Sequence, residues 1–279
     1  KAAIGIRVDF GDSEGSHLRD LSSVIDRDAS VAIVTVPRPG QAASDDALLL
    51  IRHSAAHVMA EAIQDVIGDD VLLAYGPPTE NGFFYDMFVP KAKGISSAQF
   101  EAINKRMAEI IEEDRPFTRY EQPGSEALER LRAQGNKYKL DNAERALDKP
   151  SSVYSDSKSI AARLISPIKK LRVETHNAAG DWESQKAIPE PRHDEVSAVS
   201  ESAINEAISI EPKRDRTLSF YATGTPGKNW EDLCRGPHVP STSRIGVARV
   251  MSLASAYWHG DENSDSLTRV YGTAFPTQA

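Results

Sequence analysis

The chain has 279 residues, 40% of them hydrophobic and 27% charged, with a formal net charge of −8. This composition is typical of a globular protein with one large or two ordinary domains. The sequence shows no apolar run near the roughly 18 residues of a membrane helix and no signal-peptide pattern. The net charge argues mildly against a protein that coats nucleic acid, although local basic clusters can still bind it. A single cysteine excludes an internal disulfide framework and indicates a reducing compartment, so we expect a cytoplasmic protein.

Residues 1–42 are expected to form a small β-rich module and a linker. Segments 2–9 and 30–37 alternate or are β-branched and predict strands, and residues 17–21 predict a short strand that leads into a turn. The Pro- and Gly-containing stretch that follows breaks both periodicities. Because the chain begins with Lys1 inside an alternating segment, we expect a fragment of a longer protein.

The next segment predicts an α-helix with two histidines on one face. A Ser or Asp at 44–46 can cap its start, and Gly68 can end it. His53 and His57 lie four residues apart, so both imidazoles can project toward a single point. An HxxxH pair also arises by chance, and alone it would carry little weight.

Between residues 71 and 148 strands and helices alternate. The expected elements are a strand at 71–75, a hairpin turn at Asn81-Gly82, a strand at 83–85, a helix at 97–114, a strand at 115–122, a helix at 124–134, and an extended segment with Lys137 and Lys139 on one side. Residues 151–216 are rich in Ser, Ala, Glu and Lys and poor in aromatic residues, so they predict a peripheral insertion within a domain spanning 43–279.

The remaining segments complete an α+β fold with mostly antiparallel pairing. Strands are expected at 218–221, 248–254 and 267–271, the last ending at Gly272, and no regular βαβ alternation is present.

A second pair of chemically versatile side chains lies far downstream. Cys234 and His238 are four residues apart, and Pro237 between them favours a loop over a helix. Together with His53 and His57 they could form a reactive pocket, a metal site, or both. A zinc ion is an open possibility because these are ligand types that zinc prefers.

Four motifs in order resemble one family. They are RHSAAHVMAEAI, GPPTENGFFYD, DLCRGPHVPST and AYWHGDENSDSLTRVYGTAF, and they resemble the editing domain of bacterial-type threonyl-tRNA synthetase, which is shared in outline with alanyl-tRNA synthetase. The β-rich module resembles the second half of the ubiquitin-like TGS domain that precedes editing in that family. The sequence departs from the family at His259, where Arg is usual, and in the length of the 151–216 segment.

The resemblance implies hydrolysis of the ester in seryl-tRNA(Thr), by a water-mediated route. His53 and His57 would hold or deprotonate water, with Cys234 and His238 completing the catalytic cluster. Substrate-binding roles would fall to Asp232, which can accept from the seryl ammonium, to Lys139, and to Tyr85 in the aromatic wall. Covalent catalysis by Cys234 is the less favoured route.

The resemblance also bears on cofactors and partners. It implies a metal-free editing site, with zinc at His53, His57, Cys234 and His238 as the alternative. ATP would be needed only by an aminoacylation core that these residues do not include, and a parent enzyme would be a homodimer through that core. The partner would be tRNA(Thr) carrying serine, with no membrane. The competing hypothesis is a non-catalytic tRNA-binding or zinc-stabilised structural module, although such a module would have no need of Lys139 and Asp232.

Overall fold

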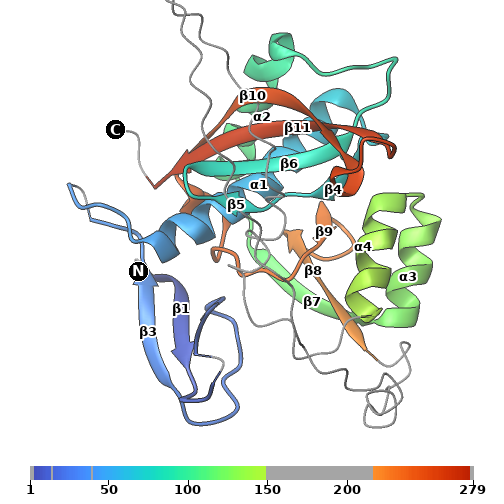
Figure 1. Cartoon of the computed structure of the whole chain (residues 1–279). Coiled ribbons are helices and arrows are strands. Elements are labelled where there is room, and N and C mark those ends of the chain that lie inside the picture. The colour runs from blue at the N-terminus through green and yellow to red at the C-terminus, as the bar shows by residue number, and fades with distance from the viewer. Residues whose placement is uncertain (1–2, 14, 39, 149–215, 277–279) are drawn as a thin grey trace, which may run out of the picture.

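The computed structural model describes residues 3–13, 15–38, 40–148 and 216–276, which form three antiparallel sheets around one long helix (Figure 1). The structure is therefore mixed α and β with antiparallel pairing, as the sequence predicts. Apart from its last residue, the proposed insertion at 151–216 lies outside the described residues.

The first sheet has the strand order β2-β1-β3, with β1 at Ala3–Asp9, β2 at Ser16–Arg19 and β3 at Ser30–Thr35. The three strands confirm the β-rich character of this module. One face buries Ile4 and Val34 in the main core, together with residues from the first turns of the long helix. That the module is half of a TGS domain stays a prediction.

Helix α1, Asp45–Ile67, is the element on which the main core is built. Ser44 caps it by accepting a hydrogen bond from the Ala47 amide at 3.3 Å, and Asp45 and Asp46 complement the positive end of the helix dipole. Gly68 ends the helix with a φ of 132°. Fourteen of the 23 residues are buried, so neighbouring elements enclose α1 on most of its surface. No helix in the described ranges is long and apolar enough to span a membrane.

The second sheet covers α1 and has the order β10-β11-β6-β4, with β5 paired to β6. Its strands are β4 at Leu72–Tyr75, β5 at Pro78–Thr79, β6 at Gly82–Phe88, β10 at Val247–Tyr257 and β11 at Ser266–Phe275. Short 3-10 turns lie at Ser97–Gln99, Thr242–Ile245 and Trp258–Gly260. Helix α2, Phe100–Glu112, lies within the helix predicted at 97–114 and packs on α1 through Ile103, Met107 and Ile110.

Two predictions about this sheet were wrong in detail. Thr79 pairs with Gly82, so the turn residues are Glu80 and Asn81, one position earlier than predicted. A Cβ at Gly82 would meet the Gly272 carbonyl oxygen at 2.3 Å, so glycine serves close strand packing there. The last strand does not end at Gly272 but runs through it to Phe275, paired with β10.

The third sheet, β7-β8-β9, lies on the other side of α1, beside helices α3 and α4 (Figure 1). The strands are β7 at Phe117–Pro123, β8 at Thr217–Thr223 and β9 at Glu231–Leu233, and the helices are α3 at Gly124–Ala133 and α4 at Lys137–Asp148. The extended segment predicted for Lys137 and Lys139 was therefore wrong. The Asn136 side chain accepts from the amides of Tyr138 and Lys139 at 3.2 Å each and begins a helix there.

The buried pair of Asp86 and Arg269 gives a test of how the second sheet is stabilised. Asp86 on β6 is fully buried and receives hydrogen bonds from Arg269 at 2.6 and 2.8 Å. Arg269→Met leaves that carboxylate without its cation, so we expect a loss of about 3–5 kcal/mol in the free energy of unfolding, measured by urea denaturation. The matched control is Lys93→Met, which breaks the exposed pair with Asp70 and should cost at most about 1 kcal/mol. Equal losses in the two variants would contradict the expectation.

Candidate active site

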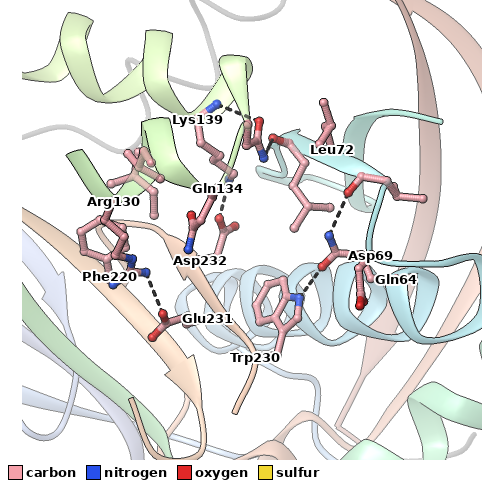
Figure 2. A pocket seen from close by; sticks show the side chains of 15 residues that line it. Gln64, Asp69, Leu72, Arg130, Gln134, Lys139, Phe220, Trp230, Glu231 and Asp232 are labelled. Carbon is pink, nitrogen blue, oxygen red and sulfur yellow. Dashed lines mark hydrogen bonds and ion pairs between the residues drawn. The ribbon is translucent and has the colours of Figure 1, made fainter. Parts of the chain in front are cut away.

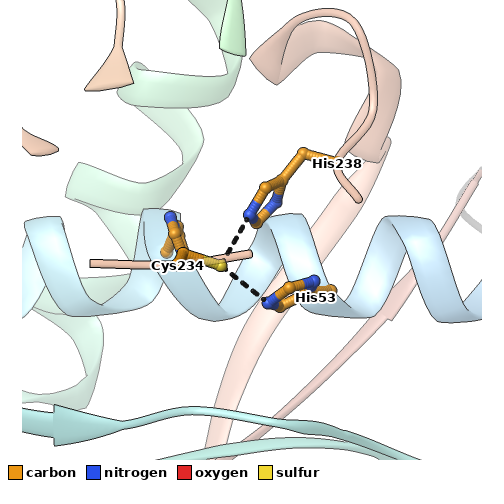
Figure 3. A group of neighbouring side chains, drawn as sticks. His53, Cys234 and His238 are labelled. Carbon is orange, nitrogen blue, oxygen red and sulfur yellow. Dashed lines mark hydrogen bonds between the residues drawn. The ribbon is translucent and has the colours of Figure 1, made fainter. Parts of the chain in front are cut away.

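Four predicted residues lie together in one cluster, although about 180 positions of sequence separate the two pairs. Figure 3 shows three of them, His53, Cys234 and His238, with the sulfur between the two rings. Helix α1 supplies His53 and His57, and the loop after β9 supplies Cys234 and His238. The cysteine sulfur is 3.4 Å from Nε2 of His53 and 3.4 Å from Nε2 of His238. One ligand atom from each of the four residues lies within 4.8 Å of those of the others.

The outer hydrogen bonds of two rings fix how they face the sulfur. Nδ1 of His53 is 3.1 Å from the Pro237 carbonyl oxygen, which can only accept, so Nδ1 carries the proton. Nδ1 of His238 is 3.1 Å from the Ser54 hydroxyl, which already donates to the Leu50 carbonyl. The Ser54 oxygen must therefore accept in this contact, so Nδ1 of His238 carries the proton and donates to it. In both neutral rings the Nε2 lone pair points toward Cys234.

A second group, formed by Lys139, Asp232 and Tyr85, adjoins the cluster. The Lys139 ammonium lies 2.6 Å from Asp232 Oδ1 and donates to the Tyr85 hydroxyl at 2.8 Å, and that hydroxyl donates to Asp232 Oδ2. All three side chains are at most 6% exposed. Nε2 of His57 is 3.9 Å from Asp232 Oδ2, so this contact joins the two groups.

Burial determines the protonation of the cluster. It lowers the pKa of His53 to about 4 and that of His57 to about 3, despite the nearby Asp232 charge, and it takes the pKa of His238 well below the ordinary value. Burial also raises the pKa of the Cys234 thiol to about 12. At neutral pH the cluster therefore consists of three neutral imidazoles and a thiol.

Asp232 behaves differently, because charged and hydrogen-bonding neighbours outweigh its burial. Burial by itself raises the pKa of this carboxyl, but the Lys139 charge and the hydrogen bonds from Lys139 and Tyr85 bring the pKa below the ordinary value. The carboxylate is therefore ionised at neutral pH. Burial and the Asp232 charge keep the pKa of Tyr85 well above its ordinary value, so its hydroxyl stays a donor.

A cavity of about 280 Å³ reaches the second group, and Figure 2 shows Lys139 and Asp232 among its lining side chains with Trp230 and Gln64 opposite them. The Trp230 indole donates to Gln64 at 2.7 Å and packs edge-on against His57, with ring centroids 5.4 Å apart. The volume is near the lower end of the range for small-molecule sites, about 300 Å³. The cavity gives a small ligand access to Lys139 and Asp232, and His57 adjoins its lining through the contacts with Asp232 and Trp230.

Sequence reasoning missed several residues that hold the cluster in place. Ser54 accepts from His238 Nδ1 and from the Val239 amide at 3.0 Å, and Phe117 stacks on the His238 ring at 4.9 Å between centroids. Tyr221 packs edge-on against the same ring. Ser54 could have been found from its place beside His53 on a buried helix face, but no sequence signal links Phe117 or Tyr221 to His238.

The donor set fits a zinc ion. Two Nε2 lone pairs already face the cysteine sulfur, and Nδ1 of His57 is buried without a hydrogen-bond partner among the described residues. Three imidazoles and one thiolate are ligands that zinc accepts in tetrahedral sites. The ion would have to displace the thiol proton, because burial favours the protonated form of Cys234.

Comparisons with known proteins agree with the resemblance seen in the motifs. Residues 218–271 match the family model of the threonyl and alanyl tRNA synthetase second additional domain. The chain is 31% identical over 276 residues to the threonine–tRNA ligase of Paramagnetospirillum magneticum, covering 99% of this chain and 30% of the relative. It is 33% identical over 264 residues to that of Rhodopseudomonas palustris, covering 94% and 28%, and 30% identical over 260 residues to that of Bdellovibrio bacteriovorus, covering 93% and 28%.

The chain is thus similar to one part of threonine–tRNA ligases and, over residues 218–271, to the second additional domain of threonyl- and alanyl-tRNA synthetases. It spans about 30% of the length of the curated relatives that it matches. The matched segment contains all but the first residue of β8, together with β9 and the loop with Cys234 and His238. His259, where this family usually has Arg, lies in the turn after β10 and contacts Asp141 of α4 at 2.7 Å, outside the histidine cluster.

The lowered pKa values predict a loss of stability in mild acid. The unfolded histidines take up protons below about pH 6.5, while folded His53 and His57 stay neutral down to pH values near 4 and 3. Since the unfolded state binds more protons, the free energy of unfolding falls as the pH falls, by roughly 1–2 kcal/mol per histidine between pH 6.5 and pH 5. Urea denaturation of the metal-free protein at both pH values measures this loss, and the double variant His53→Gln/His57→Gln should show less of it. An undiminished pH dependence in that variant would assign the effect to other groups.

Proposed function

We propose that this chain is the editing part of a threonyl-tRNA synthetase and hydrolyses the ester bond of seryl-tRNA(Thr). The observation that carries the proposal is the juxtaposition of the neutral histidine cluster with the Lys139, Asp232 and Tyr85 group, through the 3.9 Å contact of His57 with Asp232. The histidine cluster can hydrogen-bond to a water molecule, and the charged group formed by Lys139, Asp232 and Tyr85 can bind a charged aminoacyl group. Kinship with threonine–tRNA ligases supports tRNA(Thr) as the carrier of that group.

Substrate binding would use the charges of the second group. The ionised Asp232 carboxylate can accept from the ammonium of the aminoacyl ester. Lys139 uses two of its three N–H donors on Asp232 and Tyr85, so one is left for a substrate hydroxyl or carbonyl oxygen. A fixed cation at the carbonyl oxygen also stabilises the negative charge that develops there during attack by water.

The histidines would hold the attacking water rather than deprotonate it beforehand. Imidazoles with pKa values of about 4 and 3 are weak bases, but they can still orient a water molecule, and Nδ1 of His57 has no other hydrogen-bond partner among the described residues. A thiol with a pKa of about 12 is ionised in roughly one molecule in 10⁵ at pH 7, so covalent attack by Cys234 is disfavoured.

Selectivity for serine would come from exclusion of one methyl group. A synthetic pocket built for threonine discriminates against serine by only about 1–3 kcal/mol, which makes a second, hydrolytic site necessary. At that site the hydroxyl and the ammonium are held by Lys139 and Asp232, and the buried ring of Tyr85 stands beside them as a rigid wall. The additional methyl of threonine would then be forced against packed side chains, at a cost of about 1–3 kcal/mol.

Deacylation assays test the proposal. We expect this chain to hydrolyse seryl-tRNA(Thr) about 5- to 150-fold faster than threonyl-tRNA(Thr), measured with the same tRNA. His53→Ala and Lys139→Ala should each lose most of this activity. The matched control is Lys137→Ala, since Lys137 is on the same helix but pairs with Asp265 at the surface. Equal rates on the two esters, or equal losses in the Lys137 and Lys139 variants, would contradict the proposed roles.

The four converging ligand atoms favour one alternative, a zinc-stabilised module that binds tRNA without hydrolysis. Cys234→Ser separates the two functions. An editing site that works through water should keep at least about a tenth of its deacylation rate in this variant, and added zinc should not change the melting temperature of the unaltered chain. A structural zinc site predicts no deacylation, a higher melting temperature with zinc, and loss of that increase in Cys234→Ser.

A further inference from the structure

One buried carboxylate connects the N-terminal sheet to the histidine cluster. Asp20 follows β2 directly and is 8% exposed. Its Oδ1 accepts from the backbone amide of His238 at 2.7 Å, across 218 residues of sequence. Its Oδ2 accepts from the Tyr221 hydroxyl at 2.5 Å. Asp20 therefore contacts both the main chain of a cluster histidine and the tyrosine that packs against that histidine's ring.

The loop that carries Cys234 and His238 lies against this carboxylate. The φ of Gly236 is 75°, and a Cβ at this position would meet the Tyr221 hydroxyl oxygen at 2.0 Å. The main chain of the loop therefore lies directly on the tyrosine that Asp20 holds. The aromatic ring of Tyr221 in turn meets the His238 ring edge-on, with centroids 4.5 Å apart. Displacement of Tyr221 would consequently move both the loop backbone and the imidazole.

Besides the ring packing of Phe117, two sets of hydrogen bonds hold His238, one from α1 and one from Asp20. On the helix side, Ser54 holds Nδ1 of the ring and the Val239 amide. Asp20 accepts from the His238 amide and holds Tyr221, which meets the His238 ring edge-on. Without Asp20, the buried His238 amide would lose its acceptor and the Tyr221 hydroxyl would keep only the more distant Arg235 carbonyl at 3.4 Å, which is costly enough to favour a rearranged loop.

We propose that Asp20 is a positioning residue of the editing site, and that the N-terminal sheet is through this residue part of the hydrolytic machinery. Asp20 hydrogen-bonds to the His238 main chain and to Tyr221 but to no side chain that is assigned to bind the ester or water, so it acts through the placement of His238 and Cys234. The inference rests on the proposed hydrolysis for its kinetic consequence, but its structural consequence can be measured without a substrate.

A purely structural role for Asp20 would be docking of the N-terminal sheet on α1. The same sheet has another polar link to that helix, because the Arg7 guanidinium donates to Asp46 at 2.7 Å near the start of α1. Asp46 lies seven residues before His53 on α1, about two helical turns from the nearest histidine of the cluster. Arg7→Ala is thus a matched control that weakens docking and leaves the position of His238 alone.

The kinetic experiment compares Asp20→Ala, Asp20→Asn and Arg7→Ala in deacylation of seryl-tRNA(Thr). We expect Asp20→Ala to lower kcat by about 10- to 100-fold with little change in KM, as displacement of a catalytic group by about 1 Å does. Asp20→Asn should restore most of the rate, because its amide oxygen can still accept from the His238 amide. Arg7→Ala should keep the rate of the unaltered chain at any temperature where it is folded.

The second measurement uses nitrogen NMR of the histidine rings in the same proteins without tRNA. Asp20→Ala should shift the His238 ring signals, and Asp20→Asn and Arg7→Ala should leave them near their original positions. Unchanged His238 signals and an unchanged kcat in folded Asp20→Ala would overturn the inference, as would equal effects of Asp20→Ala and Arg7→Ala. If the unaltered chain hydrolyses no ester, the proposed function fails, and the His238 signals alone decide the role of Asp20.

Discussion

Burial of α1 on nearly all sides is the constraint on which the rest of the structure depends. Buried polar side chains on such a helix need partners, and Arg52, Ser54 and Glu61 find them in three different elements. Arg52 donates to main-chain carbonyls of the β5–β6 turn, Ser54 contacts the loop after β9, and Glu61 accepts from Thr223 of β8. The same side chains that satisfy hydrogen bonds therefore fix the second and third sheets around the helix, with the histidines between them.

The two HxxxH-like spacings made most of the site predictable. An i, i+4 pair on a helix must share a face, and a chain with one cysteine leaves few other partners for such a pair. The conformation of the Lys139 segment was harder to predict, because its alternating lysines suggested an extended chain. In the structure the Asn136 side chain caps a helix there by accepting from two main-chain amides. Asp20 was beyond prediction, since its partner His238 is 218 positions away and no periodicity links them.

Burial changes the chemistry that the residue types suggest in isolation. From the sequence alone, a histidine is expected to titrate near neutral pH, and a cysteine to provide a nucleophilic sulfur. In this fold the rings are neutral and weakly basic and the thiol is protonated, so the same four residues suit the ordering of water better than nucleophilic attack. Sequence gives the ligand types, but only the packing around them gives the protonation states.

The charge balance of the site explains how a cationic group could enter without displacing Lys139. The Lys139 and Asp232 charges cancel, and the three histidines are neutral at pH 7, so the site has little net charge to oppose an incoming ammonium. A carboxylate offers about four lone-pair sites, and Lys139 and Tyr85 use two of them. An ammonium could therefore bind beside Lys139 on the same carboxylate. Its positive charge would further favour neutral His57, 3.9 Å from Asp232, and so keep the ring in its lone-pair form while the ester is bound.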